Sequence, residues 1–159
     1  MVNSKLFNFL KPYKLMVSPK VSGEILMHGE PIKNIEVTLL AGFNDYYEKK
    51  VITDKEGKFT FEPIFHRQWM KPLSLNENLI GIQITAKVNS DKVLLWSSHT
   101  GLVLHDYVVI NLEKLEYELG DATYEYHFKN RVVSNGRNHL VFGACRLKGY
   151  EEKLLREDL

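Results

Sequence analysis

Residues 21–62 carry the pattern that most constrains the fold of this chain, because apolar and polar side chains alternate there between clear turn signals. Residues 35–39 read Ile-Glu-Val-Thr-Leu, and residues 59–61 read Phe-Thr-Phe. This period of two is typical of strands with one buried face and one face in water. The stretch therefore predicts a β-sheet that covers a hydrophobic core.

The turn signals in this stretch agree with the strand pattern. Between the two runs lies Thr-Asp-Lys-Glu-Gly at 53–57, where Asp54 can accept a backbone hydrogen bond and Gly57 can adopt a positive φ. We expect a hairpin here, with strands at 51–53 and 58–62. Gly29 and Pro31 mark an earlier turn.

The rest of the chain continues in the same style. Apolar residues occupy every second position from 80 to 88, further strand patterns fall at 93–97, 107–112 and 122–128, and Asn135-Gly136 is a turn signal before 140–147. We predict an all-β fold, an antiparallel β-sandwich of about seven to nine strands with short terminal helical segments. Residues 3–15 suit a short helix or an extended arm, and residues 151–159 suit a frayed helix.

Length favours one domain, since 159 residues suffice for a full core. We divide residues 1–159 into an N-terminal arm (1–20), a sandwich (21–150) and an acidic tail (151–159). The net charge of +1 argues against a nucleic-acid surface. Absence of a secretion signal and of a long apolar run predicts a cytoplasmic protein without membrane insertion.

Residues 41–50 are a turn-rich segment that is expected to be a loop. Residues 65–78 break the alternation and suit a long loop or a single helical turn. Trp, Met and Arg are enriched at protein interfaces, where they supply much of the binding energy. If both loops lie at one end of the sandwich, they form one binding surface. The candidate protein-binding residues are Tyr46, Tyr47, His66, Arg67, Trp69 and Met70.

Catalytic and metal-binding patterns are weak. Ser98 and His99 are neighbours and would point to opposite faces of a strand, so they cannot pair as nucleophile and base. The single cysteine, Cys145, lies in an apolar stretch and is expected to be a buried core residue, as is Trp96. The histidines are scattered, and Asp54 with Glu56 suits a turn better than a calcium loop. We therefore expect no enzyme activity, no metal and no cofactor.

A family resemblance rests on two quoted motifs, VSGEILMHGEPIKNIEVTLL at 21–40 and TDKEGKFTF at 53–61. They resemble the carboxypeptidase-regulatory-like, or transthyretin-like (prealbumin-like), β-sandwich. The runs EPIFHRQWMKPL and FGACRLKGY are similar to uncharacterised single-domain bacterial proteins often associated with contact-dependent secretion, such as type VI secretion. The fold also includes 5-hydroxyisourate hydrolases, whose signature Tyr-Arg-Gly-Ser is absent from this chain. The resemblance implies a binding or neutralising role.

Three functions remain open at this point. The leading hypothesis is an immunity-like antagonist that binds and occludes a secreted toxic effector. The second is an adaptor or structural module of a secretion apparatus that binds through an exposed strand edge. The third is a sandwich that binds a small ligand, such as a carbohydrate, through Trp69, Tyr46 and Tyr47. The partner's identity and the oligomeric state are left undetermined.

Overall fold

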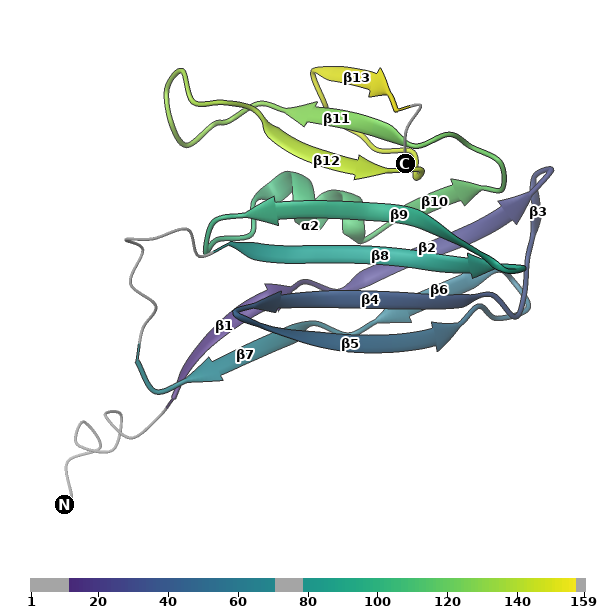
Figure 1. Ribbon diagram of the computed structural model, residues 1–159, viewed down its shortest axis with the longest axis horizontal. Helices are drawn as coiled ribbons and strands as arrows, with labels where there is room; N and C mark the ends of the chain where they lie inside the picture. Colours follow the sequence, from purple (N-terminus) through teal and green to yellow (C-terminus); the bar gives the residue numbers. More distant parts are fainter. Residues whose placement is uncertain (1–11, 71–78, 157–159) are drawn as a thin grey trace.

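The chain folds into a β-sandwich with one short helix in the part described, residues 12–70 and 79–156 of a computed structural model (Figure 1). The all-β prediction is confirmed. The elements are β1 (Tyr13–Ser18), β2 (Val21–Met27), β3 (Glu30–Pro31), β4 (Glu36–Phe43), β5 (Asp45–Ile52), β6 (Lys58–Phe61), β7 (Ile64–Gln68), β8 (Ile80–Val88), β9 (Asp91–Thr100), α2 (Asp106–Leu112), β10 (Leu115–Glu118), β11 (Tyr124–Phe128), β12 (His139–Gly143) and β13 (Glu152–Leu155).

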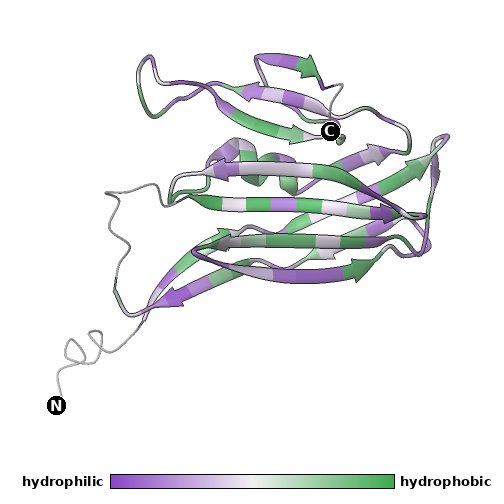
Figure 2. Cartoon of the chain, in the orientation of Figure 1, coloured by the Kyte–Doolittle hydropathy of each residue, from purple (hydrophilic) through white to green (hydrophobic). Residues whose placement is uncertain are grey.

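Seven strands form the larger sheet, in the order β13-β11-β12-β9-β8-β4-β5. Every neighbouring pair in it is antiparallel. In the interior strand β8 the even-numbered apolar side chains are all buried, whereas Gln83 and Lys87 are exposed, as the alternation predicted. Figure 2 shows the same gradient across the sheet, with β4 and β8 largely hydrophobic and β5 largely hydrophilic. The strand β5 is therefore the polar edge of this sheet.

The opposite layer is made of two long ribbons that cross behind the larger sheet. β1 pairs with β7 and β2 pairs with β6, so that Ser18 lies opposite Ile64 and Val21 lies opposite Phe61. Pro19 and Pro63 lie at the break between the β1–β7 and β2–β6 pairings. Proline has no backbone N–H, so neither residue can donate a hydrogen bond to continue the pairing. β10 adds to β2 in parallel and extends this layer.

The core lies between the two layers and beneath α2. It includes Trp96, which is fully buried, and Cys145, which has no exposed surface. Both were predicted to be core residues, and both predictions are confirmed. The indole Nε1 of Trp96 donates to the hydroxyl of Ser98 at 2.8 Å, so the buried polar atom of this side chain has a partner.

The segment 41–50, which the sequence suggested was a loop, is a tight hairpin between β4 and β5. Phe43 lies opposite Asp45, with Asn44 between them at φ 61°. Asparagine tolerates the left-handed conformation, so one residue is enough to reverse the chain. The two tyrosines that follow are therefore strand residues, and the loop prediction was wrong.

The 53–57 turn has the predicted chemistry but a different role. Asp54 Oδ1 accepts from the backbone N–H groups of Glu56 and Lys58 at 2.8 and 2.9 Å, and Gly57 has φ +68°. However, β5 pairs with β4 while β6 pairs with β2. The turn therefore carries the chain from one layer to the other, and its flanking strands do not form the expected hairpin.

Three further segments differ from expectation. Residues 107–112 were predicted as a strand but form most of α2, because Val108 and Leu112 lie one helical turn apart and are both buried. This packing overrides the strand preference of the β-branched residues. Ile64–Gln68 is strand β7, not part of a loop. At the other end, Glu152–Leu155 is strand β13 on the edge of β11, not a helix.

Three of the predicted regions are only partly covered by the structure. The strand β1 lies inside the predicted arm of residues 1–20, while the rest of the proposed helix or arm, up to residue 11, falls outside the described residues. Residues 71–78 of the second predicted loop and residues 157–159 of the acidic tail also fall outside.

Candidate functional site

Two edge strands, β5 and β7, lie along the same side of the sandwich (Figure 1). The hydroxyl of Tyr47 on β5 lies 3.1 Å from Nδ1 of His66 on β7. Phe43 packs edge-on against the same imidazole, with 6.0 Å between ring centroids. The contact joins the two layers at their open side, and we call the strands β5 and β7 together with Trp69 and Met70 the open rim.

The predicted binding residues do not form a single surface. Neighbouring residues of a strand point to opposite faces, so Tyr46 lies on the outer face while Tyr47 points inward to His66. The ring of Tyr46 covers Gly81 of β8, where an added Cβ would lie 2.6 Å from the tyrosine oxygen. Arg67 is exposed on the face of β7 opposite His66. Only Tyr47 and His66 are therefore brought into direct contact.

Trp69 and Met70 closely follow β7 and are largely exposed. Their exposed fractions are 76% and 80%, against 51% for Tyr46. Nε2 of Gln68 donates to the carbonyl of Met70 at 2.6 Å, which closes the chain over this bend. The indole and the thioether thus lie side by side in sequence at the end of an edge strand, in contact with solvent.

The outer edge of β5 is polar and has no strand partner within the described part of the chain. Lys50 lies 3.6 Å from Glu48 and 3.8 Å from Glu36, and all three side chains are well exposed. Exposed pairs of this kind contribute little to stability. Charged side chains on an open edge do, however, limit unspecific pairing with other strands.

Ser98 and Cys145, two side chains with nucleophilic groups, are both buried. Ser98 accepts the indole hydrogen bond and is buried, while His99 is exposed, so the two do face opposite ways. Burial raises the pKa of the Cys145 thiol, and the nearby carboxylates of Asp121 and Glu116 act in the same direction. Among residues 12–70 and 79–156 no three His, Cys, Asp or Glu side chains are grouped closely enough to hold a metal ion.

A second feature, not predicted from the sequence, is a cleft of about 480 Å³ between the 103–111 segment, the loop end of the β11–β12 hairpin and residues 148–151. His105 and His139 lie against each other there, with ring centroids 4.4 Å apart. The ring of Tyr107 stacks on Phe128 at 4.4 Å. The two histidines are far apart in sequence, so only the folding of the hairpin over α2 brings them together.

Comparison with known proteins assigns the chain to a family. The family model described as "Domain of unknown function (DUF6795)" matches residues 21–122. The chain belongs to this family. No curated protein and no solved structure matches it. The DUF6795 match begins with β2 and ends just before β11, so it contains β5, β7 and α2 but not the β11–β12 hairpin.

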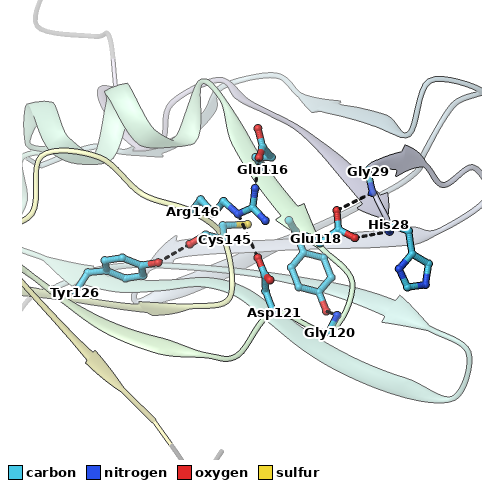
Figure 3. Close-up of polar contacts among 10 residues, drawn as sticks. His28, Gly29, Glu116, Glu118, Gly120, Asp121, Tyr126, Cys145 and Arg146 are labelled. Carbon is cyan, nitrogen blue, oxygen red and sulfur yellow. Dashed lines mark hydrogen bonds and ion pairs between the residues drawn. The ribbon is translucent and has the colours of Figure 1, made fainter.

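Polar contacts join the DUF6795 segment to the strands that follow it (Figure 3). Arg146 donates from Nη1 to Glu116 at 2.9 Å and from Nε to Asp121 at 3.3 Å, and these carboxylates, Asp121 first, raise the pKa of the guanidinium. The hydroxyl of Tyr126 donates to the carbonyl of Cys145 at 2.8 Å. The two Arg146 contacts hold the segment after β12 against the DUF6795 segment, and the Tyr126 contact joins β11 to that same later segment.

A neighbouring contact fixes the β2–β3 turn. The carboxylate of Glu118 accepts from the backbone N–H groups of His28 and Gly29, both of which have positive φ (Figure 3). This carboxylate therefore has a structural role. No helix among the described residues has the length and the apolar character needed to span a bilayer.

Proposed function

We propose that the chain is a non-catalytic protein-binding domain that uses the open rim. The observation that carries this proposal is the exposure of Trp69 and Met70 at the end of β7. Large rigid or adaptable apolar side chains of this kind supply the central contacts of many interfaces. The structural engagement of Ser98 and Cys145 supports the non-catalytic part of the proposal.

The specific form that we propose is an immunity-like antagonist, acting in the cytoplasm, that occludes a secreted toxic effector. Its support is the similarity of the runs EPIFHRQWMKPL (62–73) and FGACRLKGY (142–150) to bacterial β-sandwich proteins often associated with contact-dependent secretion. The mechanism would be steric. Trp69 and Met70 would enter a pocket of the effector, and the open rim would cover its active site.

The edge of β5, which pairs with no strand among the described residues, favours a second candidate, an adaptor of a secretion apparatus. An extended partner segment that adds to β5 would gain main-chain hydrogen bonds with little demand on sequence. The third hypothesis, a carbohydrate platform of Trp69, Tyr46 and Tyr47, has less support, because the two tyrosines lie on opposite faces of β5 and one of them contacts His66.

The deciding experiment co-expresses the chain with the products of neighbouring reading frames in its native genome. An antagonist predicts that one neighbour arrests growth alone, that this chain restores growth, and that the two form a one-to-one complex. The double variant Trp69→Ala, Met70→Ala should weaken that complex by roughly 30-fold or more, the loss expected for a hot spot. Met27→Ala, which truncates an exposed methionine on β2, is the matched control.

The outcomes separate the candidates. If the double variant restores growth as well as the unmodified chain does, the open rim is not the binding surface. Binding to apparatus proteins, with new amide-exchange protection along β5, would favour the adaptor. If no neighbour is toxic and none binds, the protein-binding proposal fails.

A further inference from the structure

The cleft between α2 and the β11–β12 hairpin has the size and lining of a small-molecule site. Its volume of about 480 Å³ falls within the range of known ligand pockets. Tyr107 and Phe128 form its stacked aromatic wall, with planes inclined by 15°. Val103, Ile110 and Val132 line the cleft, and each is more than half exposed to solvent. Apolar residues gathered around a cavity and left in water are unusual unless a ligand covers them.

Two polar atoms at the cleft have no hydrogen-bond partner among the residues that the structure describes. The hydroxyl of Tyr107 and Nε2 of His139 are buried, and neither has a hydrogen-bond partner within the described residues. Such unpaired buried groups are rare in native proteins and call for a specific explanation. Burial raises the pKa of Tyr107 to about 12, so its hydroxyl stays protonated and able to donate. Burial, together with His105, lowers the pKa of His139, so this imidazole stays neutral.

The charge around the cleft is positive. Three basic residues line it, Lys129, Arg131 and Lys148, and two acidic residues, Asp106 and Glu151. Glu151 is already 3.9 Å from Lys129. Within residues 12–70 and 79–156, neither Arg131 nor Lys148 has an ion-pair partner. These two cations outnumber the one carboxylate of the cleft outside the Lys129–Glu151 pair, that of Asp106. An anion in the cleft would therefore meet an excess of positive charge, and arginine in particular binds carboxylate or sulfonate groups through paired hydrogen bonds.

We propose that this cleft binds a small organic acid with a planar apolar body and one anionic group. The body would pack against the Tyr107–Phe128 wall and beneath Val103, Ile110 and Val132. The anion would lie toward Arg131 and Lys148. Because half of this lining comes from residues after the DUF6795 match, the site is a property of this chain's C-terminal strands as much as of the family segment.

The test uses the intact chain and two fluorescent probes of similar shape. 1-Anilinonaphthalene-8-sulfonate has a planar apolar body with one anionic group, and N-phenyl-1-naphthylamine is its uncharged counterpart. We expect one saturable site for the sulfonate probe and weaker binding of the uncharged probe. Arg131→Gln should weaken the sulfonate probe by roughly tenfold, the loss of one charge-assisted contact, and leave the uncharged probe unchanged.

Two controls place the binding. Arg137→Gln removes an arginine from the same hairpin that does not line the cleft, and it should leave both probes unaffected. The variant Trp69→Ser, Met70→Ser tests whether the probe binds the open rim instead. Urea unfolding midpoints of all variants exclude probe binding to partly unfolded protein. Competition by indole-3-acetate, but not by indole, would extend the result to carboxylates.

The proposal is overturned by any of three results. These are an absence of saturable binding, equal binding of both probes with no effect of Arg131→Gln, or loss of the signal in the Trp69→Ser, Met70→Ser variant. All measurements use this chain alone, so the result does not depend on whether the open rim binds a partner protein.

Discussion

The hydroxyl of Tyr47 lies 3.1 Å from Nδ1 of His66, and this contact links the edge strand of one layer to the edge strand of the other. Both side chains are half-buried, and their rings meet edge-on with centroids 6.2 Å apart. At the open rim the two layers are therefore joined by a polar contact between β5 and β7 as well as by apolar packing. A hydrogen bond in such a setting contributes more than one at the surface.

Removing this hydrogen bond should destabilise the protein measurably. Tyr47→Phe keeps the ring and leaves Nδ1 of His66 without its partner, so we expect the free energy of unfolding to fall by about 1 kcal/mol. Urea unfolding gives the value, and a double-mutant cycle with His66→Leu gives the coupling between the two side chains. Tyr46→Phe is the matched control, and equal losses in the two variants would show that the Tyr47 contact has no special weight.

Gly143 is predicted to tolerate no side chain. A Cβ at this position would lie 2.2 Å from the carbonyl oxygen of Leu95, a backbone atom of the neighbouring strand β9 that cannot move aside. Gly143→Ala should therefore separate β12 from β9 and lower the free energy of unfolding by about 1–3 kcal/mol or more. Gly101→Ala is the control, because nothing lies within 4 Å of its added methyl group. Thermal unfolding of the two variants should differ clearly.

The alternation of the sequence predicted strands at β4, β8, β9, β11 and β12 of the larger sheet but not most of β5 or β13, because a strand with one buried face shows a period of two in its sequence. The interior strand β8, the buried Trp96 and the turn at Asp54 and Gly57 were all predicted correctly. The sequence carries less information about which strands pair with each other. An alternating pattern identifies a strand but not its neighbour, so the 53–57 turn was predicted to form a hairpin although it connects the two layers.

The errors concern segments whose structure is decided by distant contacts. The run 107–112 has a strand-like composition, but Asn111 accepts from the backbone N–H of Lys148 at 2.8 Å and so helps to hold α2 in place. The same holds for the cleft. His105 and His139 meet only because the hairpin folds over α2, and no local pattern marks that contact. The exposure of Trp69 could be predicted because the sequence around it lacks a strand pattern. Tyr46 and Tyr47 point to opposite faces of β5, and the turn-rich sequence did not indicate a strand there.

Cys145 is predicted to be chemically inert in the folded protein. It has no exposed surface, and burial raises the pKa of its thiol, so the reactive thiolate is scarce at neutral pH. Labelling with 5,5′-dithiobis(2-nitrobenzoic acid) should therefore be slow in buffer and complete above the urea midpoint. The assay is unambiguous because the chain has one cysteine. Rapid labelling under native conditions would contradict the packing of this segment.

The contact between His105 and His139 should make stability fall at acidic pH. Burial and the neighbouring imidazole lower the pKa of His139 in the folded state below its ordinary value of 6.5, so the unfolded chain binds this proton more readily. The free energy of unfolding from this group is then highest above pH 6.5, falls as the pH drops through 6.5 toward the folded pKa, and changes no further below it.

The variant His139→Gln tests this prediction because it removes the titrating group and keeps a polar side chain. Urea unfolding between pH 8 and pH 5 should show a smaller loss of stability in this variant than in the unmodified chain. His99→Gln removes an exposed histidine on β9 outside the cluster and should retain the full loss. If both variants lose stability to the same extent on acidification, the imidazole pair is not responsible. If only His139→Gln flattens the profile, protonation of the cleft opposes the packing of α2 against the β11–β12 hairpin.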